Sequence, residues 1–208
     1  MWKWKLAQQL EWRWWKRYLG GKDRAAYLAW KTAYWSRLWA SLGMALPPDA
    51  KVLDAGCGPA GIHLLFPRQP SWAVDPLLSV YQKQQLLFSL PHTVYLNEQL
   101  EAVSIPEPMD WIFCMNVLNH TLDPVCCLKN MHQWLKPGGK LLLSVDVHRS
   151  SWGKRIFRSL PADMLHPQQF MAADYCQMLL QSGFLIEREW TEKKGVVFDY
   201  QLWLAVKP

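Results

Sequence analysis

Residues 52–61 read VLDAGCGPAG, and this stretch decides the fold. A short apolar run leads into Asp54, and Gly56, Gly58 and Gly61 follow at the spacing G-x-G-x-x-G. The spacing predicts a strand, a tight turn and then a helix, because glycine adopts positive φ and lets a ligand approach the backbone. The free N–H groups at the start of such a helix favour a polar ligand. The motif alone is not specific, since a glycine turn also occurs without a ligand.

Three later stretches stand at informative distances from this turn. Residues 71–75, SWAVD, read as a second strand, and its final Asp75 lies about 20 residues past the glycines, where a ribose-binding acid is expected. Residues 110–120, DWIFCMNVLNH, read as a strand followed by a polar cluster. Residues 134–144, WLKPGGKLLLS, read as a helix end, a Pro-Gly-Gly turn and a buried strand.

In this order the four stretches resemble the class I methyltransferases that use S-adenosylmethionine, over residues 50–148 with specific motifs and elsewhere loosely. In that family an acid at the position of Asp54 faces the positively charged methionine end of the cofactor, whereas a dinucleotide site faces a pyrophosphate there. The LKPGG turn is a further mark of the family. The resemblance implies an α/β, Rossmann-like, doubly wound fold. Its sheet has seven mostly parallel strands in the order 3-2-1-4-5-7-6, with strand 7 antiparallel.

The rest of the chain continues the α/β rhythm, which predicts a mostly parallel sheet. The expected strands are residues 51–55, 71–75, 93–96, 110–115, 140–147, 184–190 and 198–206. The expected helices are a short one after the glycine turn, then residues 77–90, 124–135 and 167–182. Asp123-Pro124 is a strong helix start.

Residues 1–48 are expected to form a Trp-rich basic helical segment ahead of a methyltransferase domain over residues 49–208. Residues 1–39 hold nine Lys or Arg against two acids, together with eight of the 14 Trp residues. Helical periodicity and the Gly20-Gly21 break predict helices over residues 1–19 and about 23–42.

Three interpretations of these helices stay open. Their aromatic side chains pack as core, or the helices form a lid over the methyl-acceptor site, or their basic, Trp-bearing face lies on an anionic membrane surface. Nucleic acid is a less favoured partner, because the aromatics are too numerous and too close to helical spacing for an open groove.

Composition limits the class of protein. A chain of 208 residues, half of them apolar, suits one domain with a sizeable core and excludes extensive disorder. No apolar run approaches the length of a membrane span, and the basic N-terminus lacks the apolar core of a secretory signal. Five Cys residues without a C-x-x-C pair fit a reducing compartment, so a cytoplasmic protein, or one peripheral to a membrane, is expected.

The strand ends of an open α/β sheet converge on one crevice, where the ligand sits. The expected cofactor-binding residues are Asp54, Gly56, Gly58, Gly61, Asp75, Gln99, Leu100, Met115 and Asn116. Asp75 is expected to accept both ribose hydroxyls. The family pattern near Y-x-x-G-D-A-E reads YLNEQLE at residues 95–101, so Gln99 replaces the acid at the adenine and Leu100 packs on the ring. Glu98 replaces the usual glycine, and its role stays open.

Methyl transfer from a sulfonium needs an acceptor held in line and dry, and a base only if the acceptor carries a proton. The candidate bases are His120, His148 and His166, and the expected substrate residues are Tyr34, Asn119, His120, Asp146 and His148. The remaining histidines, His63, His92 and His132, are expected on helix faces or loops. Asp146 and His148 share one strand face but lack a third ligand, so no metal is expected.

The leading interpretation is a methyltransferase that passes a methyl group from S-adenosylmethionine to O or N of a small biosynthetic molecule and releases S-adenosylhomocysteine. The chain lacks the Asn/Asp-Pro-Pro-Tyr/Phe motif of enzymes that methylate amino groups of nucleic-acid bases or of protein glutamine. Two alternatives remain: an RNA methyltransferase, and a non-catalytic cofactor-binding module that binds a partner or membrane through its N-terminal helices. The sequence sets neither the acceptor nor the oligomeric state.

Overall fold

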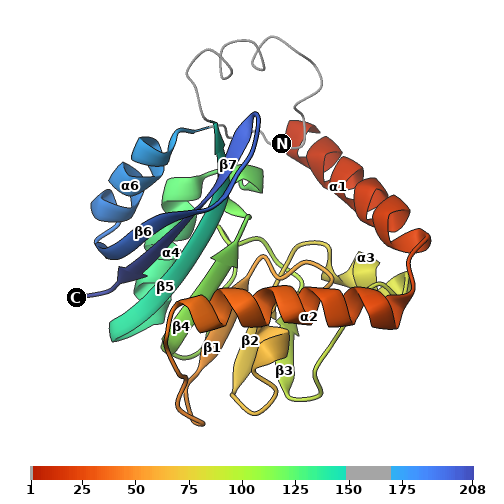
Figure 1. The fold of residues 1–208 in the computed structure, drawn as a ribbon, viewed down its shortest axis with the longest axis horizontal. Helices are drawn as coiled ribbons and strands as arrows, with labels where there is room; N and C mark the ends of the chain where they lie inside the picture. The colour runs from red at the N-terminus through yellow and green to blue at the C-terminus, as the bar shows by residue number, and fades with distance from the viewer. Residues whose placement is uncertain (1, 149–169) are drawn as a thin grey trace.

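The computed structural model describes the backbone of residues 2–148 and 170–208, and the side chains of residues 8–147 and 170–208 (Figure 1). The strands are β1 (Val52–Ala55), β2 (Ser71–Val74), β3 (Thr93–Leu96), β4 (Met109–Met115), β5 (Leu135–His148), β6 (Leu185–Lys194) and β7 (Phe198–Val206). The helices are α1 (Trp2–Gly20), α2 (Arg24–Ser41), α3 (Leu78–Lys83), α4 (Pro124–Trp134) and α6 (Ala172–Gln181), with two short 3-10 helices, η1 (Ile62–Leu65) and η2 (Leu118–His120).

The strands form one seven-stranded sheet in the order β3-β2-β1-β4-β5-β7-β6. The first five strands of this order pair in parallel, and β7 runs antiparallel to both β5 and β6. The predicted order and the antiparallel seventh strand are therefore confirmed. Because the first five strands are parallel, their carboxyl ends lie at one edge of the sheet, where a ligand site is expected.

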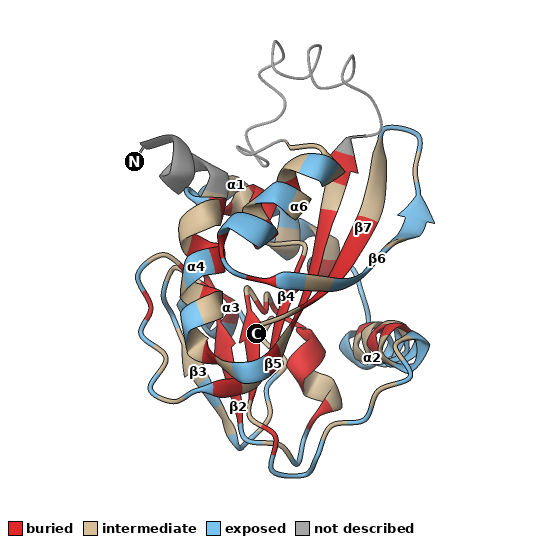
Figure 2. Ribbon diagram, turned by 90° about the vertical axis from the view of Figure 1, so that its left-hand side faces the viewer, coloured by how far each residue is buried: buried red, intermediate tan, exposed pale blue. Residues whose placement is uncertain are grey.

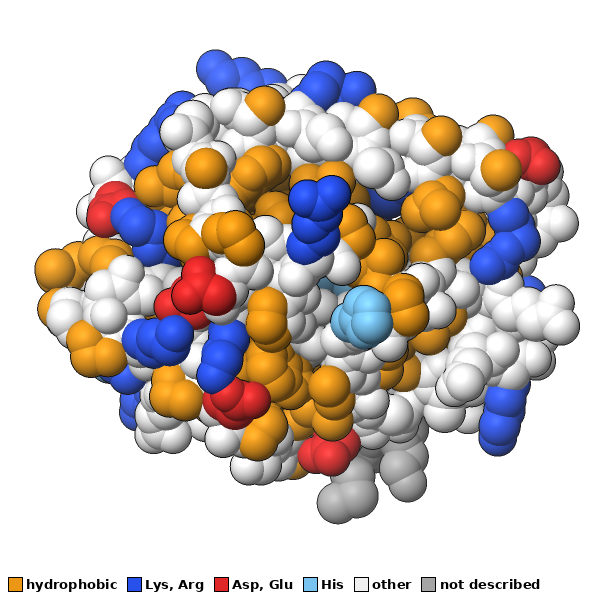
Figure 3. All heavy atoms as spheres, turned by 90° about the horizontal axis from the view of Figure 1, so that it is seen from below, with side chains coloured by type: hydrophobic (Ala, Val, Ile, Leu, Met, Phe, Trp, Pro, Cys, Tyr) orange, Lys and Arg blue, Asp and Glu red, His pale blue; other side chains and the backbone are white. Residues whose placement is uncertain are grey.

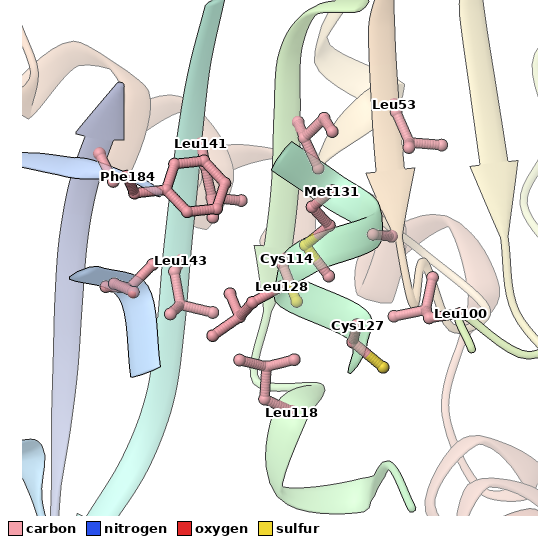
Figure 4. Close-up of a cluster of buried hydrophobic side chains, with 14 of the residues drawn as sticks. Leu53, Leu100, Cys114, Leu118, Cys127, Leu128, Met131, Leu141, Leu143 and Phe184 are labelled. Carbon is pink, nitrogen blue, oxygen red and sulfur yellow. The ribbon is translucent and has the colours of Figure 1, made fainter. Parts of the chain in front are cut away.

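Helices cover both faces of the sheet, and Figure 2 shows buried residues along the strands between them. On one face, Leu128 and Met131 of α4 pack in one buried cluster with Leu141 and Leu143 of β5 (Figure 4). The other face receives α2, whose buried Trp35 and Leu38 form a second cluster with Val52, Phe113 and Leu142. Both faces of β5 are thus buried, which explains its nearly continuous apolar run.

Two helices after the glycine turn differ from the prediction. The helix expected directly behind the glycines is only the single 3-10 turn η1, so it presents no helical row of N–H groups to a ligand. The helix expected over residues 77–90 is also wrong, since α3 spans six residues. Gln85 adopts φ +55 just beyond it, a left-handed conformation that a continuing α-helix does not allow.

The Pro-Gly-Gly stretch was expected as a turn ahead of the fifth strand, and it lies inside β5 instead. Leu135 pairs with Met109 and Lys140 pairs with Trp111, so four residues of β5 stand opposite one residue of β4. Gly138 supplies the positive φ, +73, that this bulge requires. The strand pairing therefore begins five residues earlier than the apolar run indicates.

The two N-terminal helices form where they were predicted. Asp23 caps α2, because its carboxylate Oδ1 accepts from the backbone N–H of Ala26 at 2.7 Å. Leu19 at the end of α1 is buried with Tyr27 and Ala60, so α1 packs on the glycine turn. Part of the aromatic set is thus core, and the division of the chain at residues 48 and 49 stays a prediction. Within the described residues, no helix combines the length and apolar character needed to cross a membrane.

Candidate active site

A cavity of about 530 Å³ lies between the N-terminal helices and the loops that follow β1, β2, β3 and β4. Most of the residues predicted for the site line it. These are Tyr34, Asp54, Gly56, Gly58, Gly61, Asp75, Gln99, Leu100, Met115, Asn116 and His120. The crevice expected at the strand ends is therefore present, with one wall from the sheet and the other from α1 and α2.

The glycines of the turn meet two requirements: some adopt positive φ, and some leave no room for a side chain. Gly56 and Gly58 adopt φ +80 and +56, and a Cβ on Gly56 would overlap the Val117 side chain. Gly61 has ordinary φ but faces the Asp54 carboxylate, which a Cβ there would strike. The first two glycines thus shape the turn, whereas Gly61 makes room for a buried acid rather than for a ligand.

Asp54 is held by a histidine that the sequence analysis placed on a helix face or loop. His63 is fully buried, and both its backbone N–H and its Nδ1 contact Asp54 Oδ2, at 3.0 and 2.7 Å. Its Nε2 lies 3.1 Å from the hydroxyl of Tyr95, which also accepts from the backbone N–H of Leu90. His63 lies in the short helix η1, as expected, but its side chain fixes the orientation of Asp54, a role that the sequence did not indicate.

Asp75 stands at the end of β2 with both carboxylate oxygens already in use. Oδ2 accepts from the backbone N–H of Gly58 at 3.0 Å and Oδ1 from that of Leu77 at 2.8 Å. Burial raises the pKa of Asp75 to about 6, and these two donors oppose the rise. Each oxygen retains capacity for one more donor, which matches a diol with two hydroxyl groups.

The N-terminal helices contribute residues that sequence reasoning missed, apart from Tyr34. From α1, Gln8, Glu11, Trp14 and Trp15 line the cavity, and from α2, Trp30, Lys31, Tyr34 and Trp35 do so. Their spacing of three or four residues puts each set on one helix face, so helical periodicity was the available signal. Periodicity alone does not say which face meets the sheet.

Among the described residues that line the cavity, Lys31 is the one Lys or Arg. Its ammonium lies 4.2 Å from the centroid of the Trp35 ring, and burial lowers its pKa to about 8 against the attraction of Asp54. Lys31 and Asp54 therefore present opposite charges to the same cavity. This arrangement suits a ligand group that carries both an ammonium and a carboxylate.

The cavity is also lined by Asn116, His120 and Tyr200. Asn116 adopts φ +61, and its side chain is tied to Asp146, with Nδ2 donating to Oδ2 at 3.1 Å and Oδ1 accepting from the Asp146 N–H at 3.0 Å. The Tyr200 hydroxyl lies 2.6 Å from Ser144 Oγ. Burial raises the pKa of Tyr200 well above its usual value, so this phenol stays protonated.

The remaining predicted residues are distributed differently. Asp146 orients Asn116 and does not line the cavity, and Asn119 is buried outside it. The side chain of His148 and the whole of His166 lie outside the described residues. Glu98, whose role was open, is exposed away from the cavity. In the part of the chain that the structure describes, no group of three His, Cys, Asp or Glu side chains is placed to hold a metal ion.

A family model described as a methyltransferase domain matches residues 27–189 of this chain. The chain belongs to the methyltransferase-domain family. The matched range begins inside α2 and ends inside β6, so it covers the first five strands of the chain and excludes both α1 and β7.

Two curated relatives of this methyltransferase share a functional name. The ubiquinone biosynthesis O-methyltransferase of Xylella fastidiosa (strain M23) is 31% identical over 141 residues, covering 64% of this chain and 52% of the relative. The mitochondrial protein of that name from Schizosaccharomyces pombe is 26% identical over 177 residues, covering 76% and 62%. The chain thus spans about half the length of the first of these relatives and somewhat more of the second.

Solved methyltransferases share the fold. Phosphoethanolamine N-methyltransferase 2 of Haemonchus contortus superposes with a TM-score of 0.65 at 16% identity, covering 84% of this chain and 53% of that one. The N-methyltransferase NodS of Bradyrhizobium japonicum, in complex with S-adenosylhomocysteine, gives 0.58 at 18% identity, covering 76% and 78%. At these identities the likeness shows the class I fold, whose cofactor is S-adenosylmethionine.

The residues of this methyltransferase fit that cofactor chemically. Asp75 offers two acceptor positions for the ribose diol, and Gln99 and Leu100 lie in the same cavity for the adenine. Asp54 and Lys31 offer complementary charges to the ammonium and the carboxylate of the methionine end. The individual residue roles stay predictions.

Proposed function

We propose that the chain transfers a methyl group from S-adenosylmethionine to a hydroxyl oxygen of a small aromatic acceptor. The observation that carries the proposal is the single cavity that joins a cofactor-type wall, with Asp54 and Asp75, to an aromatic wall that includes Trp30 and Tyr34. Aromatic rings bind flat acceptors by stacking and exclude water from the transfer. The O-methyltransferase names of the curated relatives support oxygen over nitrogen as the acceptor atom.

His120 is the candidate base in this proposal. When bound, the cofactor supplies a methyl group on a sulfonium, so activation lies in the cofactor and the protein positions the acceptor. A phenol or catechol hydroxyl loses its proton as the new bond to oxygen forms, and a ring nitrogen of His120 takes that proton. His120 lines the cavity from η2, directly after β4, and is half-buried.

Two further groups border the place of the acceptor. The Tyr200 hydroxyl is a neutral group that is hydrogen-bonded to both Ser144 and Tyr34, so it forms a fixed polar edge of the cavity. Asn116, fixed by Asp146, keeps its second Nδ2 proton available after the bond to the carboxylate. These groups position the acceptor, whereas His120 acts on its proton.

A methylation assay tests the proposal. The protein is incubated with S-adenosylmethionine and matched phenol, catechol and aniline acceptors, and the products are identified by mass spectrometry. Methylation of hydroxyls, reduced at least a hundredfold in His120→Gln, is the expected result, since general-base catalysis contributes about 10²–10⁴-fold. Transfer to amines alone, or cofactor binding without transfer to any acceptor, would contradict it. Retention and methylation of RNA would favour the alternative substrate class.

We also propose a membrane contact for the N-terminal helices, on a separate observation. Trp14 and Trp30 are 48% and 52% exposed, and Arg13, Lys16 and Arg17 are exposed on α1. Tryptophan and cationic side chains together suit the headgroup region of an anionic bilayer. Lys and Arg side chains are otherwise scattered among apolar and uncharged atoms on the face seen in Figure 3. Sedimentation with phosphatidylglycerol vesicles but not with phosphatidylcholine vesicles is expected, and equal behaviour with both would end this proposal.

A further inference from the structure

Helix α1 lies against the cofactor side of the cavity rather than only against its acceptor side. A Cβ built on Gly58 would lie 3.8 Å from Cζ2 of Trp15, so this helix packs directly on the glycine turn. Glu11 precedes Trp15 by one helical turn, and both line the cavity together with Asp75. Glu11 of the N-terminal segment therefore lines the same cavity as Asp75, the predicted ribose-binding acid.

Of the acids that line the cavity, Glu11 and Asp75 influence each other electrostatically, and Lys31 is the one Lys or Arg among the described lining residues. Glu11 accepts a hydrogen bond from the Trp15 side chain on its own helix, and the charge of Asp75 acts on it from the end of β2. The buried Tyr81 hydroxyl of α3 has no hydrogen-bond partner. Burial raises its pKa well above the usual value, and the charges of Asp75, Glu11 and Cys57 add to the rise. Burial and the charge of Asp75 raise the pKa of Glu11 to about 8.

The hydrogen bonds of the two acids favour Asp75 over Glu11 as the charged partner, because Asp75 accepts from two backbone N–H groups. The pKa of Asp75 is raised to about 6, below that of Glu11, because two backbone N–H groups stabilise the Asp75 carboxylate. At neutral pH, Asp75 is therefore the charged acceptor and Glu11 the protonated donor. A ribose diol has two O–H donors and two oxygen acceptors, so this pair complements it better than Asp75 alone.

We propose that Glu11 is a cofactor-binding residue, and that its protonated carboxyl donates to a ribose oxygen while Asp75 accepts from the ribose hydroxyls. The inference rests on the proposed function only in taking an adenosyl cofactor as the ligand. It makes α1 part of the cofactor site and couples cofactor affinity to the protonation of Glu11. As pH rises through 8, Glu11 becomes an anion, loses its donor and repels Asp75, so affinity falls.

Calorimetry with 5′-methylthioadenosine isolates this contact, because that ligand has the ribose and adenine but no carboxylate for Lys31. We expect the affinity of the wild-type protein to fall about tenfold between pH 7 and pH 9, since one proton with a pKa of about 8 is lost from the binding form. The isosteric Glu11→Gln keeps an N–H donor without titrating, so its affinity should change less than twofold over the same range. Glu11→Leu should bind about tenfold more weakly at pH 7.

Gln9→Leu, on an exposed position of the same helix, is the matched control and should bind as the wild-type protein does. Thermal unfolding shows whether each variant is folded, and the isosteric Gln variant keeps the test decisive if the Leu variant is not. An unchanged tenfold fall with pH in Glu11→Gln, or wild-type affinity in folded Glu11→Leu, would overturn the assignment. If the wild-type protein binds neither 5′-methylthioadenosine nor S-adenosylhomocysteine, the proposed function fails as well, so the two failures are distinguishable.

Discussion

The Nδ1 atom of His63 lies 2.7 Å from Oδ2 of Asp54, and both side chains are buried from solvent. This pair joins η1 to the end of β1 and fixes the orientation of Asp54, the acid that lines the cavity. Removing one partner of a buried polar pair leaves the other without compensation, which is costly. The pair therefore serves both the stability of the glycine turn and the orientation of the site.

His63→Ala should lower the free energy of unfolding by about 3 kcal/mol, because it strands the Asp54 carboxylate and opens a cavity. Urea unfolding followed by fluorescence measures the change. The exposed His92→Ala is the control and should differ from the wild-type protein by less than about 0.5 kcal/mol. Equal stability of the two variants would show that the buried pair contributes nothing.

Gly61→Ala should weaken S-adenosylhomocysteine binding at least about tenfold, because the added Cβ displaces Asp54 and His63 from their contact. Gly21→Ala is the comparison, since a Cβ there meets no atom within 4 Å. Calorimetry on both variants checks the expectation. Normal binding by Gly61→Ala would mean that the orientation of Asp54 does not matter to the ligand.

Asp75→Ala should weaken both S-adenosylmethionine and S-adenosylhomocysteine at least tenfold, since hydrogen bonds to a charged group contribute about 1.5–3 kcal/mol. The pH dependence has a definite sign. The raised pKa of Asp75, about 6, means that the carboxylate is lost as pH falls through 6, so wild-type affinity should drop below that pH. Titrations at pH 7.5 and pH 5 test both statements, and a flat profile would contradict the ribose assignment.

Lys31→Met should reduce the affinity for S-adenosylhomocysteine about tenfold and leave that for 5′-methylthioadenosine within about twofold, because only the first ligand carries a carboxylate. The lowered pKa of Lys31, about 8, places the loss of its charge between pH 7 and pH 9. The ratio of the two affinities should therefore fall over this range in the wild-type protein and stay constant in the variant. If this ratio changes neither with the substitution nor with pH, Lys31 does not bind the carboxylate of the ligand.

Much of the sheet was predictable because its signals are local. Apolar runs bounded by Gly and Pro located the strands, and Asp123-Pro124 marked the start of α4 to the residue. The resemblance then supplied the strand order, which no local pattern encodes. The early end of α3 was missed, because the left-handed residue that follows it is Gln85, whereas such a helix end is usually marked by a glycine.

Some site residues could likewise be predicted from local sequence signals, and others could not. Acids at strand ends, such as Asp75, were predictable because parallel strands bring their carboxyl ends together. The roles of Glu11, Lys31 and His63 were not, since each depends on how a helix or turn packs against a distant part of the chain. A histidine inside a 3-10 turn looks the same in sequence whether it faces solvent or a buried carboxylate.

Helix α2 combines anchored and free positions along one short length of chain. Leu38 is buried in the core against the sheet, Trp35 belongs both to that core and to the cavity wall, and Trp30 borders the cavity one turn away. Substitutions at the bordering positions can therefore accumulate without unfolding the domain or disturbing Asp75. Over evolutionary time, duplicated copies of such a gene can acquire new acceptors by exchanging a few aromatic residues, while the machinery for the methyl donor is inherited unchanged.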